Sequence, residues 1–140
     1  VLESIFYATS MIFVGFLEEV IFRGFLFRAL SKDNMKSAII VSSLTFGMGH
    51  IVNLLNGSAF LPTMLQIVYA TAIGFMLIMI FVKSGSIIPC IIFHAVVNST
   101  STFATDKSNT ASIIICVIIT VLSFGYGLYL MKKIPDKISE

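Results

Sequence analysis

The sequence predicts an all-α fold, a polytopic membrane helix bundle with about five transmembrane helices. Three observations predict it. Of the 140 residues, 57% are hydrophobic and only 11% are charged, whereas soluble domains carry about 25% charged residues. The mean hydropathy is +1.01. The apolar residues form long runs without strand-type alternation or an internal repeat, so a single domain, residues 1–140, accounts for the chain.

Five stretches approach the about 20 mainly apolar residues that a helix needs to cross a bilayer core of about 30 Å. Turn and capping residues separate them, and Pro62 and Pro89 fall in first helical turns, where proline is tolerated. The first residue is Val and no signal-peptide features precede the first run, so a fragment lacking upstream helices is one interpretation. The predicted spans are residues 4–27, 36–55, 60–82, 86–103 and 111–131.

The positions of the basic residues predict the orientation, because Lys and Arg concentrate in cytoplasmic loops. The second connection has none, and Lys107 in the fourth is offset by Asp106. We therefore expect the first connection, the third connection and the C-terminus to be cytoplasmic, at the plasma membrane of what the composition indicates is a bacterium. The basic residues of these three segments are Arg28, Lys32, Lys36, Lys83, Lys132, Lys133 and Lys137.

Charge and cysteine content exclude two other classes. The net charge is +2 and no dense basic tract is present, so the sequence predicts no nucleic-acid partner. Cys90 and Cys116 lie in apolar runs without the spacing of a metal site or a disulfide framework, which predicts small core residues.

A few polar residues interrupt the apolar runs, where ionisable groups cost several kcal/mol and usually mark function. At a rise of about 1.5 Å per residue, four of them lie between about 12 and about 21 Å from the predicted cytoplasmic ends: Glu19, His50, His94 and Asn98. Such a common layer near mid-membrane indicates a functional site, whereas the glutamine of the third span is typical of an interhelical hydrogen bond. The residues are Glu18, Glu19, Arg23, His50, Gln66, His94 and Asn98.

The spacing in the first span predicts unequal roles for its two carboxylates. Glu19 and Arg23 are i,i+4 neighbours, which favours an ion pair. Glu18 is turned by about 100° and can address another partner. Two adjacent carboxylates in a low-dielectric site resist double ionisation, an arrangement suited to general acid–base chemistry.

Three motifs follow in order, each in its own span. Residues 18–23 resemble EExxxR, residues 46–50 resemble FxxxH, in which Phe46 and His50 share a face, and residues 94–98 resemble HxxxN. Gly47 and Gly49 within the second motif favour close approach of a neighbouring helix or a substrate. Together the motifs resemble those of the CPBP intramembrane proteases, the CAAX prenyl endopeptidase and bacteriocin-processing or abortive-infection family, over residues 13–102.

The resemblance implies an intramembrane endopeptidase that hydrolyses a peptide bond of a membrane-associated or prenylated CAAX-type peptide. Its partners would be that peptide and the lipid bilayer, and the oligomeric state stays open. Carried over motif by motif, the roles are water activation for Glu18 with His50, support for Glu19 with Arg23, and oxyanion stabilisation for His94 with Asn98.

The resemblance leaves the use of a metal open. We expect that no cofactor is required. The alternative is a catalytic Zn²⁺ held by Glu18, His50 and His94 with water as the fourth ligand. The sequence contains nothing that resembles HExxH, in which two ligands share one helix face.

Other functions fit the same residues. A bacteriocin self-immunity or binding protein would use the fold without turnover, and a proton-coupled carrier would use the buried carboxylates. The pair Glu19–Arg23 would also serve as a purely structural ion pair.

Overall fold

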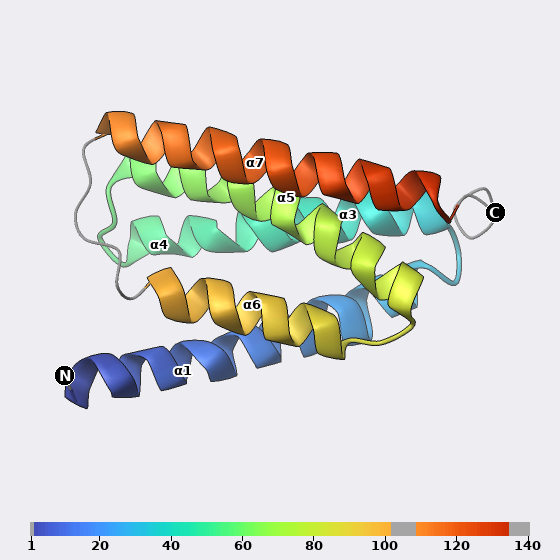
Figure 1. Ribbon diagram of the computed structural model, residues 1–140, viewed down its shortest axis with the longest axis horizontal. Coiled ribbons are helices and arrows are strands. Elements are labelled where there is room, and N and C mark those ends of the chain that lie inside the picture. Colours follow the sequence, from blue (N-terminus) through green and yellow to red (C-terminus); the bar gives the residue numbers. More distant parts are fainter. Residues whose placement is uncertain (1, 102–108, 135–140) are drawn as a thin grey trace.

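The structure is a computed structural model that describes residues 2–101 and 109–134. Within these ranges every regular element is helical, which confirms the predicted all-α bundle. Figure 1 shows the helices running roughly along one long axis, with α5 in the middle of the assembly. Among the described residues, four helical stretches are long and apolar enough to cross a membrane, and a further apolar helix has a shorter described length.

The first span is one continuous helical stretch, Leu2–Leu30, of 29 residues. It begins as α1 (Leu2–Glu19), continues as the π-helix η1 (Val20–Phe27) and ends as α2 (Arg28–Leu30). The span confirms the prediction for residues 4–27, but the π-helix was not predicted. Because π-helical turns are rare and concentrate at functional sites, the widened segment directly after Glu19 indicates that this part of the helix belongs to a functional site.

The second span also changes its helical type part-way. It comprises α3 (Met35–Met48), a 3₁₀ turn η2 (Gly49–Ile51) and α4 (Val52–Leu55). The side chain of Asn34 caps α3 by accepting a hydrogen bond from the backbone N–H of Ser37 at 2.8 Å. The 3₁₀ turn contains His50, which the sequence placed in a regular helix.

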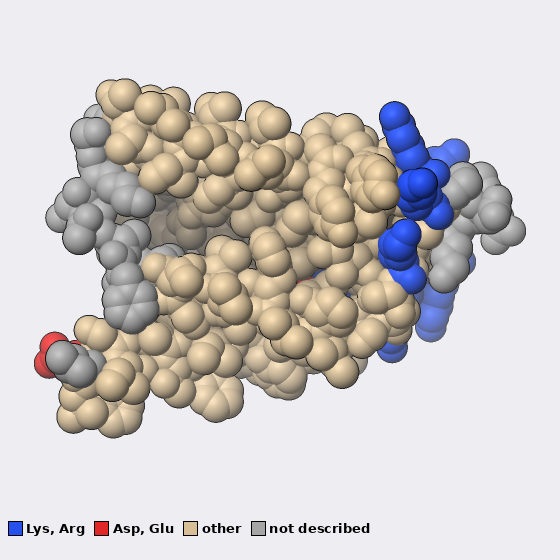
Figure 2. Space-filling model, in the orientation of Figure 1, with Lys and Arg blue, Asp and Glu red and all other residues tan. Residues whose placement is uncertain are grey.

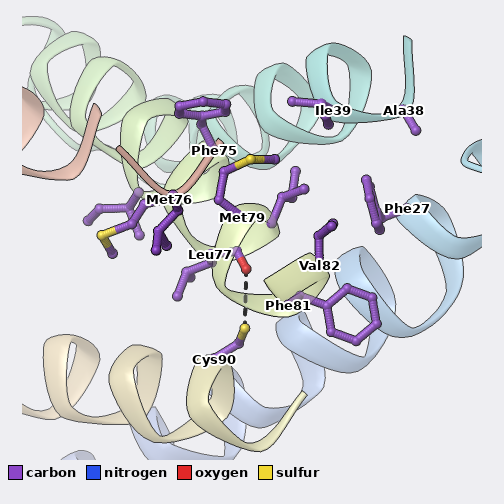
Figure 3. Close-up of a cluster of buried hydrophobic side chains, with 13 residues drawn as sticks. Phe27, Ala38, Ile39, Phe75, Met76, Leu77, Met79, Phe81, Val82 and Cys90 are labelled. Atoms are coloured by element: carbon purple, nitrogen blue, oxygen red, sulfur yellow. Dashed lines mark hydrogen bonds between the residues drawn. The ribbon is translucent and has the colours of Figure 1, made fainter. Parts of the chain in front are cut away.

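The third span, α5 (Phe60–Ser84), forms the centre of the core, and α7 (Asn109–Lys132) packs along it. The helix α5 ends at Gly85, which adopts the left-handed conformation at φ 69° that glycine tolerates best. Figure 3 shows side chains of α5 packing with residues of α3 and of the first span. Cys90 donates a hydrogen bond from Sγ to the Leu77 carbonyl at 3.3 Å, and both cysteines are buried free thiols, as predicted.

The described part of the fourth predicted span is helix α6 (Ile88–Ser101), which begins two residues after the predicted start. Its 14 residues correspond to about 21 Å of helix. Its start is set by Ser86, whose hydroxyl accepts a hydrogen bond from the Ile88 N–H at 3.2 Å, and by Pro89 in the first turn. Residues 102 and 103 of the prediction lie outside the described residues. Helix α6 packs mainly against α1, which places the HxxxN motif beside the EExxxR motif.

Basic residues gather at one end of the bundle. On the face in Figure 2, the Lys and Arg side chains lie together at the end where α5 and α7 finish and α3 begins. This confirms that the first and third connections and the end of α7 share one side, as alternating spans require. Asp106, Lys107 and Lys137 lie outside the described residues.

Candidate active site

The predicted ion pair forms inside the bundle. Arg23 donates a hydrogen bond from Nη1 to Glu19 Oε1 at 2.9 Å, and both side chains are 0% exposed. A second bond runs from Arg23 Nη2 to the Gly74 carbonyl of α5 at 2.9 Å. Since buried charges are tolerated only when paired and hydrogen-bonded, these bonds fix the guanidinium and the carboxylate in place.

His94 lies between the two carboxylates. Its Nδ1 is 2.8 Å from Glu19 Oε1, and its Nε2 is 3.3 Å from Glu18 Oε2. The oxygen of Glu19 also accepts from Arg23, and an ionised carboxylate can only accept, so His94 Nδ1 is the donor. The other nitrogen, Nε2, therefore faces Glu18 and can exchange a proton with it.

The two carboxylates differ in their access to the outside. The Glu19 side chain is 0% exposed, whereas that of Glu18 is 31% exposed. His94 is buried between them. The cluster thus has a closed side, held by Arg23, and an open side, formed by Glu18.

Phe46 connects the remaining motif to this cluster. The guanidinium carbon of Arg23 lies 4.4 Å from the centre of the Phe46 ring, within the range of a cation–π contact. The rings of His94 and His50 pack edge-on against Phe46, with centroid distances of 5.4 and 6.1 Å. Phe46 thereby brings the FxxxH motif to the other two motifs.

Three glycines permit the close packing on which the cluster depends. A Cβ on Gly15 would lie 3.2 Å from the Ala95 backbone nitrogen, so this glycine lets α6 approach α1 one turn before Glu19. A Cβ on Gly47 would lie 2.7 Å from the Ile67 carbonyl oxygen of α5, which confirms the predicted close approach there. A Cβ on Gly74 would lie 3.0 Å from Phe46 Cδ1. A Cβ on Gly49, in contrast, would meet no described atom within 4 Å.

The two remaining predicted residues lie on α6 and α5. Asn98 is on α6 one turn after His94 and is half-buried. Gln66 accepts a hydrogen bond from the Asn53 side chain at 2.8 Å, which confirms its prediction as an interhelical contact, here between α4 and α5.

The structure thus brings together Glu18, Glu19, Arg23 and His94 by direct contact and adds His50 through Phe46. Sequence reasoning missed the central place of Phe46 and the contribution of Gly15. An aromatic residue four positions before His50 was visible in the motif, but its partners lie on α6 and η1, far away in the sequence.

The three residues of the alternative zinc set have different neighbours in the structure. Among residues 2–101 and 109–134, no group of three or more His, Cys, Asp and Glu side chains is placed to hold a metal ion. Glu18 and His94 are in contact, whereas His50 lies edge-on to Phe46, with ring centroids 6.1 Å apart.

A comparison with protein families identifies the chain. The family model described as type II CAAX prenyl endopeptidase Rce1-like matches residues 1–100. The chain belongs to this family. The matched residues include all three motifs and every residue of the cluster described above. No curated protein and no solved structure shows significant similarity to the chain.

Membership in the Rce1-like family agrees with the features of the fold. The family consists of CAAX-type intramembrane proteases, whose substrates are peptides or prenylated proteins. The long apolar helices make this Rce1-like chain an integral membrane protein. The buried charged cluster within its helices is where membrane proteins place function.

Proposed function

We propose that this Rce1-like chain hydrolyses a peptide bond of a membrane-associated or prenylated CAAX-type peptide with water activated by Glu18 and His94. One observation carries the proposal: His94 presents a nitrogen to each of two carboxylates, one buried and fixed by Arg23, the other accessible. This is the order of groups that general acid–base catalysis needs, with an orienting carboxylate, an imidazole and an exposed partner.

In the first step, Glu18 removes a proton from water as the water oxygen bonds to the carbonyl carbon. The partial exposure of Glu18 supports this role, because the base must reach both water and substrate. The buried atoms Glu19 Oε2 and Arg23 Nε have no hydrogen-bond partner within the described part of the chain. Buried polar atoms of this kind commonly bind water, which supports a hydrated cluster.

In the second step, the carbon–nitrogen bond breaks and the leaving amine takes up the proton. The contact between Glu18 Oε2 and His94 Nε2 supports transfer of the proton through the imidazole. Glu19 and Arg23 take no proton in this scheme. They hold His94 in the orientation in which Nε2 faces the accessible side.

The tetrahedral intermediate needs hydrogen-bond donors for its oxyanion. We assign this role to the Asn98 amide, one turn after His94, with His50 as a second donor. The resemblance paired His50 with Glu18 and His94 with Asn98. The contact of His94 with both carboxylates favours the roles proposed here instead, in which His94 works with Glu18.

The test is cleavage of a prenylated CAAX-type peptide and of its unprenylated counterpart by the purified chain in lipid nanodiscs. We expect Glu18→Gln and His94→Gln each to lower the turnover rate by about 10²–10⁴-fold, the contribution typical of a general acid–base group. Glu3→Gln is the matched control, because Glu3 is an exposed carboxylate of the same helix.

Two results would refute the proposal. Full cleavage by Glu18→Gln would exclude Glu18 as the base. The second result has two parts: the unchanged protein cleaves no peptide, and the Glu18→Gln variant still protects cells against a bacteriocin. That result would favour the immunity function over proteolysis.

A further inference from the structure

A groove on the bundle lies apart from the cluster of Glu18 and His94. Its volume is about 620 Å³, and it lies along α5 with α3 on one side and α7 on the other. None of the six candidate catalytic residues lines it. Residues that form its walls and floor include Ile39, Leu44, Ala72, Phe75, Phe124 and Leu128.

The lining offers apolar surface and almost no hydrogen bonds. The hydroxyl of Ser43 donates to the Ile39 carbonyl at 2.7 Å, and that of Thr71 donates to the Ile67 carbonyl at 2.8 Å, so both are satisfied within their own helices. A peptide backbone needs hydrogen-bond partners in an apolar environment, which this surface does not provide. The groove therefore suits a hydrocarbon chain.

The one charged residue in the described lining lies at an end of the groove. Lys36 is in the first turn of α3, at the end of the bundle where basic residues gather (Figure 2). On α7 the lining extends from Thr120 to Met131, which corresponds to about 16 Å of helix. Half of a bilayer core is about 15 Å, so the groove has the depth of one leaflet.

We propose that this groove binds one acyl chain of an anionic phospholipid from the leaflet at the basic end of the bundle. The spanning helices run along the direction of lipid chains, so an acyl chain can lie parallel to α5 between α3 and α7. The lipid phosphate then reaches Lys36 at the level of the headgroups.

The test measures how strongly spin-labelled lipids are immobilised by the chain in bilayers. The probes are phosphatidylglycerol and phosphatidylcholine with the same labelled chain. We expect phosphatidylglycerol to be preferred by about fivefold, which is the effect of one lysine near an anionic headgroup. Lys36→Gln abolishes this preference, and Lys32→Gln, an exposed lysine outside the groove, retains it.

A second variant tests the acyl chain rather than the charge. Val68 is exposed and lines the groove, so Val68→Trp fills it and lowers the immobilised fraction of both lipids while the peptidase assay reports that the protein is folded. The proposal is overturned if Lys36→Gln leaves the lipid preference unchanged. It is also overturned if Val68→Trp leaves the immobilised fraction unchanged, or if a prenylated peptide displaces the bound lipid.

Discussion

Gly74 lies outside the three motifs, yet two contacts tie it to the candidate active site. Its carbonyl accepts the hydrogen bond from Arg23 Nη2 at 2.9 Å. A Cβ at this position would lie 3.0 Å from Phe46 Cδ1 and 3.4 Å from Phe46 Cβ and Cγ. Carbon atoms prefer a separation of about 3.5–4.0 Å, so Gly74→Ala forces the Phe46 ring to retreat by about 0.5 Å.

The displacement should affect catalysis more than stability. Overpacking costs about 1–3 kcal/mol, and alanine in place of glycine returns about 1 kcal/mol of helix propensity, so the net change in the free energy of unfolding stays below about 2 kcal/mol. The ring also contacts Arg23 at 4.4 Å and His94 at 5.4 Å. A misplacement of about 1 Å costs about 10²-fold in rate, so about 0.5 Å corresponds to about a tenfold loss.

The assay is steady-state cleavage of a prenylated peptide, analysed as kcat and KM. We expect Gly74→Ala to lower kcat by about tenfold with a smaller change in KM. Gly125→Ala is the control, since a Cβ there meets nothing within 4 Å, and it should leave both constants unchanged. In a Phe46→Leu background, Gly74→Ala should have no further effect, because the clashing ring is gone.

Two outcomes would refute this reasoning. Gly74→Ala with the kcat of the unchanged protein would show that the ring does not position the cluster. An equal loss in both backgrounds would show that Gly74 acts by another route than Phe46.

Three further predictions follow from the contacts. Arg23→Met should lower the free energy of unfolding by about 3 kcal/mol in denaturant titrations, because it leaves the Glu19 carboxylate buried without its cation, whereas Lys32→Gln should leave that free energy unchanged. Gln66→Leu should cost only about 0.6 kcal/mol and leave kcat unchanged, since it removes one interhelical hydrogen bond away from the cluster, and a large loss of kcat would contradict this placement. Prolonged dialysis against a strong chelator should leave cleavage intact, and restoration of lost activity by Zn²⁺ would show instead that a metal is required.

The sequence predicted those features that depend on hydropathy or on spacing within a single helix. Apolar length located the spans, and the i,i+4 spacing of Glu19 and Arg23 predicted their ion pair correctly. The basic residues predicted which connections share an end of the bundle. These are local properties, which do not require knowledge of how the helices pack.

Other features escaped the sequence for physical reasons. Mean hydropathy depends on which residues a segment contains and not on its backbone hydrogen bonds, so it does not distinguish an α-helix from a π-helix, and the widened turn after Glu19 was missed. The contact of His94 with Glu18 and Glu19 depends on how closely α6 approaches α1, and Gly15 permits that approach. The pairing of motif residues is thus a property of helix packing, and the order of motifs along the chain did not predict it.

The two buried thiols make it possible to measure how often the helix bundle opens. Cys90 is 0% exposed, and its sulfur donates a hydrogen bond to the Leu77 carbonyl of α5. Cys116, on α7, is 4% exposed. A maleimide dye can alkylate them only when the bundle opens, so the rate of labelling records opening events without any introduced mutation. The labelling rate therefore separates two kinds of active-site variant: those whose bundle opens more often, and those that are impaired in the chemical step alone.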